Sequence, residues 1–210
     1  FGLRYFEARF GTRPDIYWSP DTFGHNGQMP QILLACGFRG FVTQKLAWNQ
    51  LTHPPHNSFR WRGIDGSEVL AHLPPIGTYN AELTPRERRG ALTEFRDHDR
   101  AGGSLALFGH GDGGGGPTTE ILDRATRCRD LRGLPLVELS SAATFFDGLE
   151  AEADRLETIT GQLYLEYHRG TYTSQARTKR GNRRSEVALH DAELLSCLGG
   201  DYPREELVRL

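Results

Sequence analysis

The chain has 210 residues, of which 37% are hydrophobic and 25% charged, and its formal net charge at pH 7 is −2. This length allows one domain with a hydrophobic core, or one domain followed by part of another. The near-neutral charge argues against a nucleic-acid binder that neutralises phosphates, and no apolar run approaches the roughly 20 residues of a membrane-spanning helix. We therefore expect no nucleic-acid partner and no membrane partner.

The cysteines Cys36, Cys128 and Cys197 lie far apart, are odd in number and form no CxxC pair. This pattern excludes a disulfide scaffold and a cysteine-rich zinc site, and it favours a reducing compartment such as the cytoplasm. Lysine occurs only at Lys45 and Lys179, so arginine carries nearly all of the positive charge. We associate that bias with a GC-rich, bacterial coding sequence. The first residue is not methionine and the last lies within a helical pattern, so we expect a fragment.

Short apolar runs alternate with helical patterns, which is typical of an α/β domain with a parallel sheet. The predicted strands are Asp15–Trp18, Gly40–Thr43, Glu68–Leu73, Ser104–Phe108 and Pro135–Leu139. One helix is predicted near Pro30 and another after Thr84, which opens the capping box Thr84-Pro85-Arg86-Glu87. A third is predicted after Thr118, which precedes an apolar stripe at helical spacing.

The composition changes after a charged stretch at residues 149–157. From Thr173 onward the pattern predicts one long arginine-rich helix that ends at Gly199-Gly200. We therefore place a domain boundary near residues 150–160, with an α/β domain at residues 1–158 and the start of a helical domain at 159–210.

Polar clusters follow the predicted strands, at the carboxyl edge of the sheet where such domains gather their chemistry. Ser19-Pro20-Asp21 follows the first strand, Gln44-Lys45 the second, and His110-Gly111-Asp112 the fourth, while His72 lies at the end of the third. A further polar group, within residues 161–174, mixes aromatic, acidic and basic side chains. Packing at a domain interface is the alternative interpretation for that last group.

The first cluster carries a carboxylate, Asp21, which Pro20 fixes next to the aromatic ring of Phe23. A carboxylate held against aromatic rings is the arrangement that stacks a sugar and attacks its anomeric carbon. The alternative is that Asp21 only caps a turn or a helix.

Two other patterns are less informative. The glycine-rich run 111–116 lacks the lysine and serine or threonine that complete a phosphate-binding loop, so it is weak evidence for a nucleotide site. The prolines of His53-Pro54-Pro55-His56 exclude a helix, which argues against a zinc-binding helix there.

Five sequence blocks, taken in order, resemble glycoside hydrolase family 38, the α-mannosidases, in the branch that includes cytosolic and bacterial enzymes. The blocks are 18–25 with 29–32, 43–49, 59–67, 111–117 and 165–174. Each block alone is weak, but their shared order is specific and spans essentially the whole chain. The resemblance implies part of a (β/α)7 barrel-like catalytic domain at residues 1–158. The first helix of a three-helix-bundle middle domain would follow at 159–210.

The resemblance further implies a zinc-assisted retaining α-mannosidase that acts on mannose-containing oligosaccharides. Asp21 falls on the family's nucleophile and zinc ligand, and the remaining zinc ligands lie outside this chain, so we expect the fragment alone to be inactive. Glu166 is our first choice of general acid/base, and Asp112 is the second choice or else a hydroxyl-binding residue. The residues expected to bind substrate are Phe23, Lys45, Trp48, His110, His168 and Tyr172.

Two other functions are consistent with the sequence. A metal-dependent carbohydrate deacetylase would use Asp21 as a base, and a non-catalytic carbohydrate-binding protein would keep the aromatic residues without needing Asp21 or Glu166. The sequence leaves open whether the protein forms a homo-oligomer.

Overall fold

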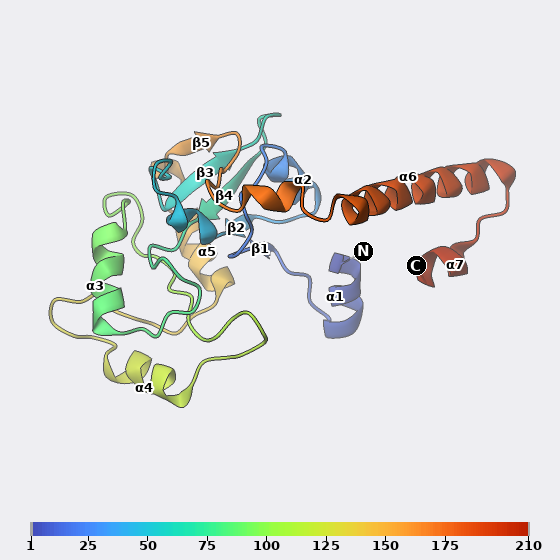
Figure 1. The fold of residues 1–210 in the computed structure, drawn as a ribbon. Coiled ribbons are helices and arrows are strands. Elements are labelled where there is room, and N and C mark those ends of the chain that lie inside the picture. Colours follow the sequence, from blue (N-terminus) through green and yellow to red (C-terminus); the bar gives the residue numbers. More distant parts are fainter. Residues whose placement is uncertain (1, 210) are drawn as a thin grey trace. The chain divides into compact units, whose positions relative to one another are not determined.

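The computed structural model describes residues 2–209, which divide after Tyr167 into two compact units (Figure 1). The first unit holds a five-stranded sheet in the order β1-β2-β4-β3-β5. Its strands are β1 Ile16–Trp18, β2 Gly40–Val42, β3 Ser58–Arg62, β4 Glu68–His72 and β5 Thr158–Thr160. Its helices are α1 Gly2–Phe10, α2 Met29–Ala35, α3 Pro85–Glu94, α4 Thr119–Arg127 and α5 Ala142–Glu150, with 3-10 turns η1 Lys45–Trp48 and η2 Ala153–Arg155.

The sheet is mostly parallel, as the α/β prediction requires. β1 pairs in parallel with β2 and β2 with β4, so these three strands end at the same edge. β3 runs antiparallel to β4 and parallel to β5. The short loop that joins β3 to β4 contains Gly66 at a φ of +89°, a backbone conformation that glycine adopts without strain.

Three of the five predicted strands are confirmed, as β1, β2 and β4. The predicted strands 104–108 and 135–139 are wrong, because their backbones join no strand ladder and only Phe108 forms an isolated bridge, with Ala81. Leu107 is nevertheless 7% exposed. An apolar run can therefore line the core without pairing in a sheet. Apolar character alone does not distinguish such a segment from a strand.

The capping chemistry placed the helices correctly. The Thr84 hydroxyl accepts the Glu87 N–H at 3.2 Å, and the Glu87 carboxylate accepts the Thr84 N–H at 2.9 Å, which completes the capping box of α3. The Thr118 hydroxyl likewise accepts the Ile121 N–H at 3.3 Å at the start of α4. Helix α5, which the sequence analysis missed, begins at Ser141, whose hydroxyl accepts the Thr144 N–H at 3.1 Å.

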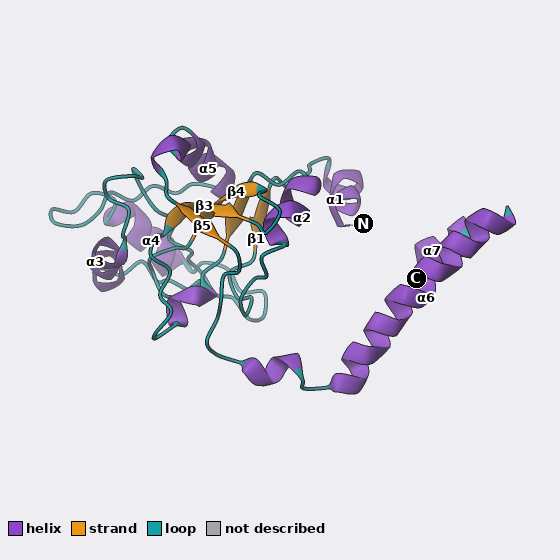
Figure 2. Ribbon diagram, turned by 90° about the horizontal axis from the view of Figure 1, so that it is seen from above, coloured by secondary structure: helices purple, strands orange, loops and turns teal. Residues whose placement is uncertain are grey.

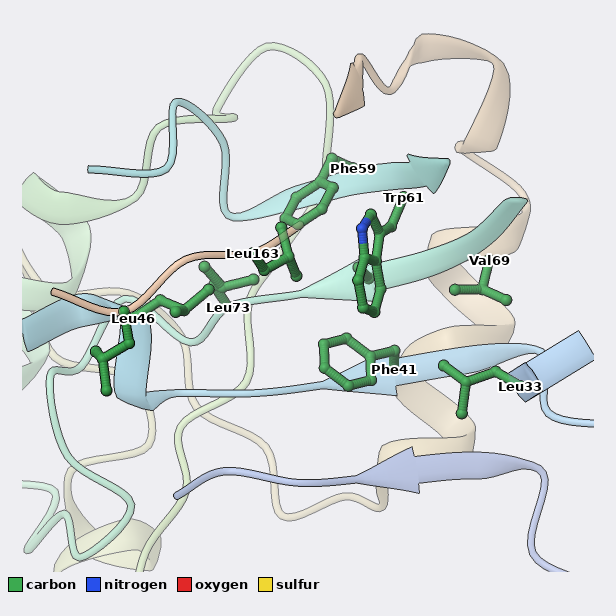
Figure 3. Packing of buried hydrophobic residues seen from close by; sticks show 10 residues of the cluster. Leu33, Phe41, Leu46, Phe59, Trp61, Val69, Leu73 and Leu163 are labelled. Atoms are coloured by element: carbon green, nitrogen blue, oxygen red, sulfur yellow. The ribbon is translucent and has the colours of Figure 1, made fainter. Parts of the chain in front are cut away.

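The core lies on both faces of the sheet. On one face Phe41, Phe59 and Trp61 pack with Leu33 of α2 (Figure 3). On the other face Val42 packs with Phe146 of α5, and Figure 2 shows this helix along the sheet. Because β2 is buried on both faces, its sequence is a continuous apolar run, as expected of an inner parallel strand. No helix within residues 2–209 is long and apolar enough to span a bilayer.

The second unit contains η3 Arg169–Tyr172, the long helix α6 Ala176–Gly199 and the short helix α7 Arg204–Arg209. Helix α6 ends at Gly200, whose φ of +79° forms the C-cap, as the Gly199-Gly200 pair predicts. The division between the units differs from the boundary expected at residue 158. Residues 159–167 belong to the first unit because β5 pairs with β3, and Leu163 and Leu165 are buried in the first core.

Candidate active site

A cavity of about 510 Å³ lies at the carboxyl edge of β1 and contains both predicted aspartates, Asp21 and Asp112. Its other lining residues come from 18–20, 105–111, 115–117 and 140–142, together with Tyr79. Two clusters separated by some 90 residues in the sequence therefore share one concave site. The volume falls within the roughly 300–1,000 Å³ typical of small-molecule sites.

The loop that carries Asp21 is fixed to the end of β2. The Ser19 N–H donates to the Val42 carbonyl at 2.9 Å, and the Lys45 N–H donates to the Pro20 carbonyl at 2.8 Å. These bonds hold the chain as it leaves β1 and direct the next residue, Asp21, to the rim of the sheet. The turn η1 begins at Lys45, so the same contacts also place the Lys45 side chain beside Asp21.

Lys45 is a buried cation, with a side chain only 6% exposed. Its Nζ lies 2.7 Å from Asp21 Oδ1, 3.5 Å from the centre of the Trp48 ring and 5.5 Å from the centre of the Phe23 ring. A carboxylate and two aromatic faces thus replace water around the ammonium group. Within residues 2–209, Asp21 Oδ1 is buried and has no hydrogen bond of good geometry, so its contact with Lys45 is an ion pair only.

Asp112 is held by Tyr79, a residue that the sequence analysis missed. The Tyr79 hydroxyl donates to Asp112 Oδ1 at 3.0 Å and to Oδ2 at 3.1 Å. Burial, the hydrogen bond to Asp112 and the charge of Asp21 raise the pKa of Tyr79 to about 12. The phenol therefore keeps its proton and is influenced by both carboxylates. Its only sequence signal is its place in the loop that follows β4.

Gly111 allows the Asp112 loop to approach Tyr79. A Cβ atom at Gly111 would lie 2.9 Å from the Tyr79 ring, which is too close for any other residue without a shift. The Gly111 N–H also donates to Asn80 Oδ1 at 2.6 Å. Part of the glycine-rich run therefore serves close packing against residues 79 and 80.

Glu166, the first choice of general acid, is engaged elsewhere. Its carboxylate accepts the N–H groups of Gln50 at 2.8 Å and Leu51 at 2.9 Å, and it also accepts that of Thr52. The Gln50 N–H, together with those of Thr52 and Leu51, lowers the pKa of Glu166 to about 2. A general acid must carry a proton at the working pH, which this environment opposes. Glu166 also does not line the cavity, so its role as general acid/base stays a prediction that these contacts do not favour.

The other predicted substrate residues have different environments. His110 lines the cavity. Phe23 and Trp48 face the Lys45 ammonium group and are not among the residues that line the cavity. His168 and Tyr172 belong to the second unit, so their contribution remains a prediction.

A zinc ion would find one suitable ligand here. The Oδ1 of Asp21 is buried and contacts the Lys45 ammonium, and carboxylate oxygen is an established zinc ligand. Within the part of the chain that the structure describes, no group of three or more histidine, cysteine or acidic side chains could hold a metal. Asp21 therefore fits as a single contributor to a zinc site.

Comparison with known proteins identifies the family of the chain. A family model described as the glycosyl hydrolases family 38 N-terminal domain matches residues 1–169, and one described as the alpha mannosidase middle domain matches residues 166–210. The first of these matches covers well over half of the chain. The chain belongs to glycosyl hydrolase family 38.

Several relatives of the chain are named alpha-mannosidases. Alpha-mannosidase G of Dictyostelium discoideum is 47% identical over 196 residues, which cover 93% of this chain and 18% of that protein. Human alpha-mannosidase 2C1 is 48% identical over 197 residues, covering 94% of this chain and 19% of that protein. An alpha-mannosidase structure from Enterococcus faecalis V583 shares the fold, with a TM-score of 0.71 at 17% identity over 96% of this chain and 25% of that one. The chain thus spans about a fifth of the length of the curated relatives it matches.

Proposed function

We propose that the full-length protein is a retaining α-mannosidase that removes terminal α-D-mannosyl residues from oligosaccharides. In this proposal Asp21 is the nucleophile and Asp112 is the general acid/base. The observation that supports it is the shared cavity, in which both carboxylates act on the Tyr79 hydroxyl. A retaining glycosidase needs two carboxyl groups that flank the scissile bond at about 5–5.5 Å from each other.

In the first step an Asp21 oxygen bonds to the anomeric carbon while the bond from that carbon to the leaving oxygen breaks. Asp112 gives its proton to the leaving oxygen, so the aglycone departs as a neutral alcohol. The Lys45 ammonium, 2.7 Å from Asp21 Oδ1, fixes the orientation of the attacking carboxylate before the sugar arrives.

In the second step Asp112 takes a proton from water, and the water oxygen attacks the anomeric carbon as the bond to Asp21 breaks. The Tyr79 hydroxyl remains protonated throughout, because its pKa is raised to about 12. It can therefore keep donating to Asp112 and hold its carboxyl group toward the cavity. The Glu166 carboxylate takes no part in either step and anchors the loop after η1.

Asp21 is the residue of this chain that would hold zinc, through an oxygen of its carboxylate. A zinc ion bound there would supply Lewis-acid contacts to neighbouring sugar hydroxyls. We further propose a cytoplasmic location, which fits the three free cysteines at Cys36, Cys128 and Cys197.

Trapping tests the proposed function. The full-length protein, incubated with a fluorinated mannosyl substrate that forms the glycosyl-enzyme but hydrolyses slowly, should gain the mass of one fluorosugar. Peptide mapping should place that mass on the peptide containing Asp21. An intact protein that turns over an aryl mannoside but gains no mass under these conditions would contradict a covalent mechanism, and an adduct on another residue would contradict the role of Asp21.

A further inference from the structure

A second cavity, of about 340 Å³, borders the turn η1 and the loop after β4. Its walls include Leu46, Ala47, Pro54, Leu73, Pro74 and Pro75, and its polar side chains include His53, His56, Glu94 and Arg96. None of these residues lines the cavity that holds Asp21.

One polar group in this cavity is rigidly oriented. The Nδ1 atom of His56 lies 2.7 Å from Oδ1 of Asp97, a carboxylate that is fully buried. The other Asp97 oxygen accepts the N–H groups of Asn57 at 2.6 Å and Ser58 at 2.9 Å. Because this carboxylate only accepts in these contacts, the Nδ1 of His56 is the donor, and the neutral ring carries its lone pair on Nε2. The His56 side chain is 19% exposed and lies among the residues that line the cavity.

The cavity is held open by contacts between the segments around it. Asn57 donates through Nδ2 to the Leu73 carbonyl at 2.8 Å and accepts the Arg96 N–H on Oδ1 at 2.9 Å. The Arg96 guanidinium donates to the Pro54 carbonyl. Three segments distant in sequence are therefore linked around one space, which makes the cavity a preformed feature of the fold.

The chemistry of the lining favours a neutral ligand rich in hydroxyl groups. The acidic Glu94 and the basic Arg96 oppose each other in charge, so neither an anion nor a cation is favoured. Proline rings and Leu73 offer apolar surface, and His56 Nε2 offers one fixed acceptor. An apolar surface with a few oriented polar groups suits a pyranose ring, which has an apolar face and hydroxyls at its rim.

Two short segments connect this cavity to the candidate active site. Lys45 contacts Asp21, and the next two residues, Leu46 and Ala47, line the second cavity. Gly77 lines the second cavity, and Tyr79, two residues further on, lines the first. The two cavities are therefore bordered by neighbouring positions of the same two chain segments.

We propose that the second cavity binds the leaving-group side of the oligosaccharide, with a sugar hydroxyl donating to His56 Nε2. This inference rests on the proposed function. It assigns His56 a role in binding and Asp97 a role in positioning His56, and it places the specificity for oligosaccharides over simple glycosides in this cavity.

The test compares two substrates in the full-length protein. An aryl α-mannoside has one sugar ring and does not need the second cavity, whereas an α-linked mannobiose does. In His56→Gln the flexible amide can still donate to Asp97, but its oxygen is no longer held at the position of the Nε2 acceptor. We expect kcat/KM for mannobiose to fall about tenfold, mainly through KM, as the loss of one hydrogen bond predicts. The value for the aryl mannoside should stay within about twofold.

His53→Gln is the matched control, because His53 lines the same cavity and has no carboxylate partner within residues 2–209. It should change neither substrate by more than about twofold, and thermal unfolding of both variants should show whether the fold is kept. An equal loss for both substrates, no loss for either, or a larger mannobiose effect in His53→Gln would overturn the proposal.

Failure of the proposed function would be visible separately, as wild-type protein that hydrolyses neither substrate. In that case calorimetric titration of mannobiose and of methyl α-mannoside, into the Asp21→Asn protein with and without His56→Gln, gives the same comparison without turnover. Weaker binding of mannobiose alone would support the second site. Equal binding of mannobiose to both proteins would overturn it.

Discussion

Asp112 and Glu166 each contribute a carboxylate to a polar cluster of the sequence, but in the structure the two groups have different hydrogen-bond partners. Asp112 accepts one tyrosine hydroxyl and lines the cavity that contains Asp21. Glu166 accepts three successive backbone N–H groups and does not line that cavity. A carboxyl group that hydrogen bonds hold in its charged form makes a stable anchor, and one with a single neutral donor can exchange a proton with a substrate. The partners of each group, rather than its motif, decide its role.

The largest effect on turnover should come from Asp21, because the proposed mechanism needs this nucleophile whichever carboxylate is the general acid/base. Asp21→Asn in the full-length protein removes the attacking oxygen's charge and should lower kcat for an aryl mannoside by about 10⁴-fold or more, as removing a nucleophile typically does. Steady-state kinetics measures this, with thermal unfolding to confirm that the protein is folded. Near-normal turnover in a folded variant would remove Asp21 from the mechanism.

Tyr79→Phe changes the surroundings of Asp112 and should have an intermediate effect on catalysis. The change deletes the hydroxyl that bonds both Asp112 oxygens but keeps the ring that packs on Gly111. We expect kcat/KM for a disaccharide to fall about tenfold, the scale of one lost hydrogen bond. Unchanged kinetics across the pH range would show that Asp112 does not depend on this donor.

Glu166→Gln should have the smallest effect on catalysis and a distinctive effect on stability. The pKa of Glu166 is lowered to about 2 in the folded protein, from an ordinary value of 4.5. The resulting stabilisation is present above about pH 4.5 and is lost as the pH falls toward 2, because the unfolded state then binds the proton first. The melting temperatures of wild type and variant should therefore differ most above pH 5 and converge near pH 2. A difference that does not change with pH would contradict the anchoring role.

Much of the fold follows from local signals in the sequence. The caps at Thr84 and Thr118 mark helices because the side chains that satisfy the first N–H groups lie within three residues of them. The strands β1, β2 and β4 lie at the positions that their apolar runs predicted. β3 and β5 were missed, and β5 is defined by its pairing with β3, about 100 residues earlier in the chain.

Part of the candidate site was also predictable from local signals in the sequence. Asp21 follows β1 and lies beyond its carboxyl end, whereas Asp112 follows the apolar run 104–108, most of which lines the cavity without joining the sheet. The burial of Lys45 between Asp21 and two aromatic rings, and the contact of Tyr79 with Asp112, arise from the tertiary fold. The contacts of Glu166 have the same origin, because its partners at residues 50–52 lie more than 110 residues away in the sequence.

The most direct test of this account compares Asp112→Ala with Glu166→Ala in the full-length protein, on an α-linked mannobiose and on an activated aryl mannoside. An activated aryl group leaves largely without protonation, whereas a sugar needs a general acid. Asp112→Ala should slow mannobiose cleavage by about 10²–10⁴-fold, and aryl mannoside cleavage far less, with azide restoring the second step. Glu166→Ala should slow both substrates alike and gain nothing from azide. The reverse pattern, with substrate-dependent loss and azide rescue in Glu166→Ala, would contradict the assignment of Asp112 as the general acid/base.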